Sequence, residues 1–271
     1  GAQPEERGPC QSGGRAGSRC RVERRRVVDR AEPIGILWPR AGAMIARHDR
    51  GTLLPAMSTH RDVSIVITCF DYGRFLAEAV ASALGQDGGS PEVIVVDDGS
   101  TDPDTLTALD ALPGEAQVLR RANGGPARAR NTGAAAATGE LLLMLDADDR
   151  LAPDALAAMR QPLDADPGLG FAYGRTRCFG AMSGELAFPP YDPYKLLYRS
   201  LVSVTSLVRR EAFEAVGGFD PDVPGYEDWD FYLSLLEAGW EGRRVDRVTL
   251  HYRRHDRSAF TADRADYRRR W

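Results

Sequence analysis

The run Leu141 to Asp149, L-L-L-M-L-D-A-D-D, constrains the fold more than any other stretch. Five consecutive apolar residues are too few for an isolated helix and are typical of a strand buried on both faces of a parallel sheet. Asp146, Asp148 and Asp149 follow where this strand leaves the sheet, and open α/β sheets bind ligands beyond the carboxyl ends of their strands. These carboxylates suit a hard divalent cation with a phosphorylated substrate. The alternative is a solvated acidic turn or a helix cap.

Composition narrows the class of protein. With 271 residues the chain is long enough for one or two domains with a buried core, and its net charge of -4 argues against a dedicated nucleic-acid binder. The cysteines show no metal-ligand or disulfide spacing, so we expect a reducing compartment and a cytoplasmic protein. No long apolar run is present and the N-terminus lacks the apolar core of a signal peptide, so neither a membrane span nor secretion is predicted.

The first 58 residues differ from the rest of the chain. They contain 11 arginines, much glycine and proline, and no sustained apolar periodicity. We predict a disordered tail, or sequence translated ahead of a natural start at Met57. The alternative is that residues 19–30 form a basic arm for an anionic membrane surface or a nucleic acid.

From Val63 onward the pattern alternates between strands and helices, which predicts an α/β fold with a mostly parallel sheet. The predicted strands of the first half cover 63–68, 93–96, 117–120 and 141–145, and the predicted helices cover 74–84, 104–112 and 127–137. In the second half we expect helices over 151–159, 211–216 and 226–238, strands over 170–176, 202–209 and 248–252, and a loop over the site within 178–199.

Polar groups also follow the other predicted strands. Asp97 and Asp98 end the strand 93–96, ahead of the residues that would cap the next helix. The glycine-rich turn before the helix 127–137 presents N–H groups that favour an anion. Arg128 and Arg130 lie two positions apart on that helix, so only one of them can point easily into a site.

Four motifs in this order resemble the nucleotide-sugar half of a family 2 glycosyltransferase with the GT-A fold: V-S-I-V-I-T-C-F-D-Y, V-I-V-V-D-D-G-S-T-D, N-G-G-P-A-R-A-R-N-T-G and L-L-L-M-L-D-A-D-D. The resemblance covers residues 62 to 258. It implies one GT-A domain over 59–262, a Rossmann-like sandwich whose nucleotide-sugar half (59–150) precedes an acceptor half (151–262), followed by a basic end (263–271). The implied donor is a nucleoside-diphosphate sugar, most often UDP-linked, and the implied cofactor is Mg²⁺ or Mn²⁺.

The same resemblance implies individual roles. The nucleotide-binding residues would be Thr68, Phe70, Asp97, Asp98, Arg130 and Asp146. Asp148 would be the direct metal ligand, with Asp146 nearer the ribose and His255 of the Y-R-R-H segment as a third ligand. The arginines of that segment would neutralise the departing diphosphate. One departure is Asp71, which stands where the family commonly has asparagine.

In the second half, G-G-F-D at Gly217 to Asp220 followed by E-D at Glu227 and Asp228 resembles the acceptor motif of the same family. A hydroxyl is a poor nucleophile, and a carboxylate within hydrogen-bond reach can remove its proton during attack. Asp228 is therefore the candidate base, and Glu227 would orient it or bind acceptor hydroxyls. The alternative is that both acids only stabilise the first turn of the helix 226–238 through its dipole.

These observations together predict a metal-dependent, inverting glycosyltransferase that acts on a glycan, a lipid-linked or another hydroxyl acceptor in cell-surface polysaccharide or glycan biosynthesis. We expect no nucleic-acid partner and no transmembrane segment, and peripheral contact with the inner face of a membrane is compatible with the sequence. A sugar nucleotidyltransferase is disfavoured because T-C-F-D-Y-G stands where that class has a G-x-G-T-R-type loop. A non-catalytic nucleotide-sugar-binding domain is the other alternative. The donor sugar, the acceptor and the oligomeric state are not determined by the sequence.

Overall fold

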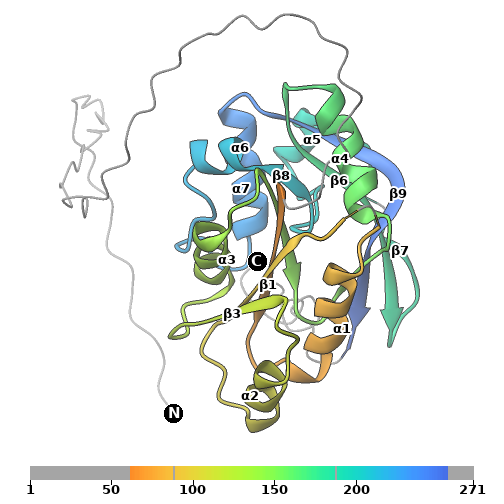
Figure 1. Ribbon diagram of the computed structural model, residues 1–271. Coiled ribbons are helices and arrows are strands. Elements are labelled where there is room, and N and C mark those ends of the chain that lie inside the picture. The colour runs from red at the N-terminus through yellow and green to blue at the C-terminus, as the bar shows by residue number, and fades with distance from the viewer. Residues whose placement is uncertain (1–61, 88, 187, 256–271) are drawn as a thin grey trace, which may run out of the picture. The chain divides into compact units, whose positions relative to one another are not determined.

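The computed structural model describes residues 62–87, 89–186 and 188–255 (Figure 1). The predicted tail 1–58 and the basic end 263–271 lie outside the described residues. A sheet of nine strands organises the described part, in the order β3-β2-β1-β4-β8-β6-β9-β5, with β7 paired to β6. The strands are β1 Val63–Cys69, β2 Glu92–Asp97, β3 Ala116–Arg120, β4 Leu141–Asp146, β5 Arg150–Leu151, β6 Leu169–Gly180, β7 Gly184–Leu186, β8 Leu207–Arg209 and β9 Glu241–Arg254.

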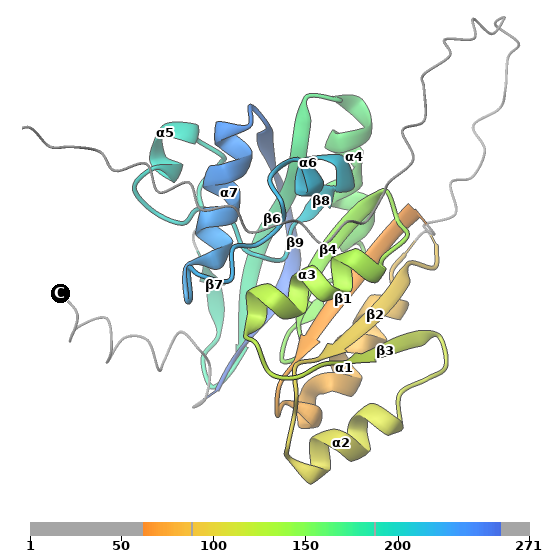
Figure 2. The same cartoon turned by 90° about the vertical axis from the view of Figure 1, so that its left-hand side faces the viewer.

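Strands β3, β2, β1 and β4 run parallel, whereas β8 pairs antiparallel with both β4 and β6. The helices are α1 Gly73–Leu84, α2 Pro103–Asp110, α3 Pro126–Ala136, α4 Ala155–Ala165, α5 Pro193–Leu196, α6 Arg210–Ala215 and α7 Glu227–Glu237. Residues of α1, α2 and α4 pack in one hydrophobic cluster with the sheet, and residues of α3, α5, α6 and α7 in another. Figure 2 shows α3 lying against the strands of the sheet, and its cluster is not the one that contains α1. The predicted α/β fold of the GT-A type is confirmed.

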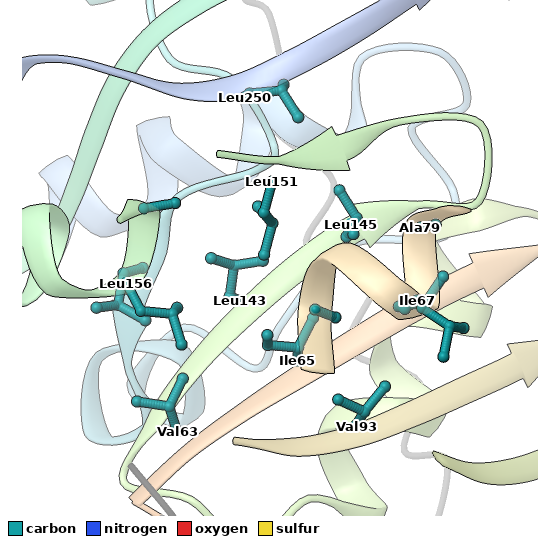
Figure 3. Packing of buried hydrophobic residues seen from close by; sticks show 14 of the residues in the cluster. Val63, Ile65, Ile67, Ala79, Val93, Leu143, Leu145, Leu151, Leu156 and Leu250 are labelled. Atoms are coloured by element: carbon teal, nitrogen blue, oxygen red, sulfur yellow. The ribbon is translucent and has the colours of Figure 1, made fainter. Parts of the chain in front are cut away.

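The alternation of side chains along the central strands explains these two layers. Ile65 and Ile67 of β1 belong to the α1 cluster, while Val66 between them belongs to the α3 cluster. Leu143 and Leu145 of β4 face the α1 side in the same way (Figure 3). Because successive strand residues point to opposite faces, an unbroken apolar run needs a helix layer on each side. The prediction that Leu141 begins a doubly buried strand is confirmed.

The second half departs from the sequence prediction in several places. Residues 150–151 form strand β5, paired with β9, and α4 begins only at Ala155 rather than near Pro153. The apolar side chain of Leu151 fills the α1 cluster, and the N–H of Ala152 donates to the carbonyl of Thr249, so tertiary pairing replaces the expected helical turn. The expected strand 202–209 is limited to β8, whereas the strand expected over 248–252 extends over all of β9.

The segment expected to be a loop within 178–199 contains β7 and the short helix α5. Asp192 caps α5, since its carboxylate accepts from the N–H groups of Tyr194 and Lys195 at 3.1 Å. Within the described ranges, no helix combines the length and apolar character that crossing a membrane requires. The predicted cytoplasmic location rests on the sequence alone.

Candidate active site

The carboxyl ends of the parallel strands bring the motif residues to one edge of the sheet. Thr68 of β1 lies in register with Asp146 of β4, and Cys69 lies in register with Asp97 of β2. The hydroxyl of Thr68 donates to Oδ1 of Asp146 across 3.2 Å. Residues from three separate motifs therefore meet where open α/β sheets bind ligands.

Arg130 connects this edge to the second half of the chain. Its Nη2 donates to Oδ1 of Asp146 at 3.0 Å, and its Nη1 donates to Oε1 of Glu227 at 2.9 Å. The side chain of Arg130 is only 6% exposed, that of Glu227 10%, and that of Asp146 36%. Arg128 is exposed, so the prediction that one of the two arginines lies at the surface is confirmed. A guanidinium with two carboxylate partners explains how a charged side chain is buried here.

The candidate base lies in the first turn of α7. Oε2 of Glu227 accepts from the N–H of Gly225 at 2.9 Å, and Oδ1 of Asp228 accepts from the N–H of Trp229 at 2.7 Å. Burial raises the pKa of Asp228 above the usual range of an aspartate, as do the charges of Glu227 and Asp146, while Arg130 opposes the shift. A carboxylate with a raised pKa is a better proton acceptor, which suits the predicted role.

Asp148 and His255 meet at the same edge. Nε2 of His255 lies 3.0 Å from Oδ2 of Asp148, and the His255 ring packs against Tyr72 and Phe75, with centroids 5.4 and 5.2 Å away. Burial and the nearby Asp146 raise the pKa of Asp148, and His255 opposes this. The distance between Asp148 and His255 is the length of an ordinary hydrogen bond, and it is also about the spacing of two neighbouring ligands on an octahedral ion with bonds of about 2.1 Å.

The predicted set of three metal ligands is not assembled, however. Among the residues that the structure describes, no three His, Cys, Asp or Glu side chains form a group that could hold a metal ion. Oδ1 of Asp146 is engaged by Arg130 and Thr68 instead. The carboxylate of Asp148 fits a site in which the remaining ligands are phosphate oxygens and water, the usual arrangement for Mg²⁺ bound with a nucleotide, and His255 lies beside it.

Asp149 and Arg253 support this corner of the site. Oδ1 of Asp149 accepts from the backbone N–H of Arg253 at 2.7 Å, and burial holds the pKa of Asp149 well above its usual range. The guanidinium of Arg253 lies between the rings of Phe75 and Phe179, and it donates to the carbonyl of Asp148 and to Glu78. Arg253 is thus anchored by protein groups, and the expected contact with a diphosphate stays a prediction.

The two acids at the end of β2 have different surroundings. Oδ1 of Asp97 accepts from the N–H of Ser100 at 2.9 Å. The carboxylate of Asp98 accepts from the N–H groups of Gly124 and Gly125 and pairs with Arg121. The anion expected at the glycine-rich turn is therefore the protein's own Asp98. Both acids are buried, and their expected contact with the nucleotide stays a prediction.

Phe70 and Asp71 lie in the loop after β1, and their surroundings explain why these residue types stand in the first motif. Asp71 adopts a φ of 55°, and its carboxylate accepts from the N–H groups of Thr101 and Asp102 at 2.8 and 2.9 Å. Asparagine and aspartate are the residues that tolerate this backbone region, which accounts for the exchange of one for the other. Phe70 is 45% exposed beside this loop, as a residue that stacks on a base would need to be.

Sequence reasoning missed one residue that supports the site from outside it. Asn131 follows Arg130 in the quoted motif, and its amide forms two reciprocal hydrogen bonds with the backbone of Phe219: Nδ2 donates to the carbonyl at 2.7 Å, and Oδ1 accepts from the N–H at 2.9 Å. These bonds hold the G-G-F-D segment against α3. No spacing in the sequence relates positions 88 residues apart, so only the motif itself carried a signal.

Comparison with known proteins identifies the family. The family model described as glycosyl transferase family 2 matches residues 64–215, more than half of the chain, and a model described as the N-terminal domain of galactosyltransferase matches residues 186–257. A hyaluronan synthase of Pasteurella multocida is 29% identical over 198 residues, covering 69% of this chain and 20% of the synthase. A chondroitin synthase of Escherichia coli is 30% identical over 184 residues, covering 65% and 27%.

Solved structures agree with this comparison at the level of fold. TarS of S. aureus, in a complex with UDP-GlcNAc, superposes with a TM-score of 0.62 at 20% identity, covering 72% of this chain and 59% of TarS. The chain spans about a fifth of the length of the Pasteurella hyaluronan and chondroitin synthases. With its fold, its ordered motifs and a family match over more than half its length, the chain belongs to glycosyltransferase family 2.

Proposed function

We propose that this chain is a metal-dependent, inverting glycosyltransferase that moves a sugar from a UDP-linked donor to a hydroxyl of a glycan acceptor in polysaccharide biosynthesis. The observation that carries the proposal is the pair of ion contacts from Arg130 to Asp146 and Glu227. These contacts bring an acid of the nucleotide-sugar half and an acid of the acceptor half to one residue. Donor and acceptor groups would therefore react at a common centre.

The nature of the relatives supports the substrate class. The matched proteins include hyaluronan and chondroitin synthases, and the solved TarS structures include complexes with UDP and UDP-GlcNAc. On the donor side, the exposed Phe70 would stack on the base, and Asp146 would accept from the ribose hydroxyls. Asp148 and His255 would hold Mg²⁺ or Mn²⁺, which when bound supplies positive charge to the diphosphate leaving group.

On the acceptor side, Asp228 would act as general base. Its carboxylate would take the proton of the acceptor hydroxyl while that oxygen bonds to the anomeric carbon and the bond from that carbon to the diphosphate oxygen breaks. The electron pair of the broken bond leaves with the diphosphate. A single in-line displacement inverts the configuration at the anomeric carbon, and no covalent enzyme intermediate is needed.

The test is transfer by the purified chain. UDP release would be measured from a panel of UDP-sugars with Mn²⁺, with and without glycan acceptors, and the product's anomeric configuration would be read by NMR. Asp228→Asn should lower transfer by about 100- to 10,000-fold, the usual contribution of a general base. Asp230→Asn is the matched control, because Asp230 lies in the same helical turn but its carboxylate is near Asp220. It should retain activity.

Metal dependence is tested in the same assay. Chelation by EDTA should abolish transfer and added Mn²⁺ should restore it, while Asp148→Asn should weaken Mn²⁺ binding measured by electron paramagnetic resonance.

Full transfer by Asp228→Asn would contradict the assignment of the base. Binding of UDP-sugar without any turnover would contradict the enzyme and favour a non-catalytic nucleotide-sugar-binding domain.

A further inference from the structure

The surroundings of Arg130 do not resemble those of a ligand-binding arginine. Both Nη atoms donate to protein carboxylates, the side chain is only 6% exposed, and the Phe219 ring lies 5.5 Å from the guanidinium carbon. The remaining Nε is also buried. To reach a base or a diphosphate, Arg130 would have to break both ion pairs and leave Glu227 buried without its partner, which is strongly unfavourable.

The two partners of Arg130 come from elements that are far apart in the sequence. Asp146 ends β4, and Glu227 begins α7, 97 residues from Arg130 in the chain. Asp146 is the most exposed of the three side chains, so its carboxylate can contact a ligand from the front while Arg130 holds it from behind. Glu227 precedes Asp228 directly, so the position of Glu227 determines where the first turn of α7 presents the candidate base.

We propose that Arg130 is a positioning residue for transfer, which holds the first turn of α7 against Asp146 so that Asp228 faces the donor's anomeric carbon. The inference rests on the proposed function and deepens it. The planar guanidinium presents its N–H groups in a rigid fork, so one arginine can join two carboxylates in a fixed geometry. A lysine carries the same charge on a single ammonium group at the end of a flexible side chain, so it cannot fix the two acids relative to each other.

The neighbouring Asn131 provides a matched control. It lies on the same helix and also connects α3 to the acceptor half, but through the backbone of Phe219 rather than through either acid. Loss of its two hydrogen bonds should lower the thermal stability, as loss of Arg130 also would. A purely structural role of Arg130 therefore predicts similar effects of Asn131→Ala and Arg130→Lys on both stability and turnover.

The experiment compares Arg130→Lys, Glu227→Gln, the double variant and Asn131→Ala. For each, kcat and both KM values would be measured, with UDP affinity by calorimetry and melting temperature by circular dichroism. Arg130→Lys should lower kcat by about 100-fold, the effect of displacing a catalytic group by about 1 Å. UDP affinity should fall far less than kcat. The double variant should be no slower than the slower single variant, because the two residues act as a unit.

Three results would overturn the positioning role. The first is a loss of UDP affinity with unchanged kcat in Arg130→Lys, and the second is a loss of kcat in the double variant that equals the product of the two single losses. The third is a loss of kcat in Asn131→Ala as large as that in Arg130→Lys. In each of these cases the unaltered chain still transfers sugar, so the proposed function stands. If the unaltered chain neither transfers sugar nor releases UDP, the proposed function fails and the positioning role fails with it. The two failures are therefore distinguishable.

Discussion

At the scale of single residues, the site depends on how its carboxylates are buried. Burial raises the pKa of Asp228 and of Asp148. Arg130 opposes the rise at Asp228, and His255 opposes the rise at Asp148. The two acids thus lie in separate electrostatic environments although both belong to one site. Separate environments are what different roles for chemically identical groups require.

The environment of Asp228 leads to a prediction about pH. A base must be ionised, so kcat/KM should rise with pH through the raised pKa of Asp228 and level off above it. Arg130 of α3 and the N–H of Trp229 lower this pKa, while Asp146 of β4 and Glu227 of α7 raise it. Glu227→Gln removes a like charge and leaves Arg130 with one partner fewer, and both changes favour the ionised base. The acidic limb of the residual activity should therefore move to lower pH.

The pH profile of kcat/KM for each variant is the measurement. Asp230→Asn is again the control, since burial and the charge of Asp220 are what shift the pKa of Asp230, and its acidic limb should coincide with that of the unaltered chain. If the acidic limb stays in place in Glu227→Gln, the rise of kcat/KM with pH reports the ionisation of another group and not of Asp228.

At the scale of elements, α3 is the helix on which the site depends. Its second turn holds Arg130 and Asn131, and the following turn packs against the central strand β1. A Cβ atom placed on Gly133 would lie 2.2 Å from Cγ1 of Val66, so the helix can approach β1 this closely only with glycine there. The close approach determines the distance at which Arg130 meets Asp146 and Glu227.

Gly133→Val should therefore push α3 away from β1. We expect a loss of unfolding free energy of about 1–3 kcal/mol, the usual cost of overpacking a core, together with reduced transfer. Ala135→Val introduces the same side chain on the exposed face of the same helix, and it should change stability by only a few tenths of a kcal/mol. Urea denaturation of both variants is the measurement. Equal stability of the two would contradict the close packing of α3 on β1.

At the scale of the whole molecule, the first and second halves of the described chain share one sheet. Strand β8 of the second half pairs with β4 of the first half, and β6 and β9 follow it. The buried hydrophobic residues of the described part all lie between Val63 and Leu250. The groups that we assign to the reaction lie on these strands and helices or in the loops at their ends, as Phe70, Asp148 and His255 do.

Removing residues 1–56, so that the chain starts at Met57, should leave this fold and its transfer activity unchanged. The reason is that the described core and the candidate site are built from residues 62 to 255. Thermal melts by circular dichroism and the transfer assay, each compared with the 271-residue chain, are the measurements. A lower melting temperature, loss of solubility or loss of transfer would show that the first segment contributes to the domain.

The sequence alone determined the fold class, the parallel first half and the motif residues at the strand ends, because these depend on local periodicity and on the types of residue next to each other. The run ending at Asp146 was sufficient to predict a doubly buried strand with a site at its end. The second half was predicted less well, since β5, β8 and β9 owe their extents to pairing with distant strands rather than to local preference.

Only the tertiary structure decided how the motif residues are used. It showed that Asp98 holds the glycine-rich turn, that Arg253 is anchored between two rings, and that Arg130 joins Asp146 to Glu227. These relations connect positions that are far apart in the chain, and no local pattern encodes which donor a carboxylate will meet. A motif identifies the groups available for chemistry, whereas the packing of helices on the sheet determines which of them can reach a substrate.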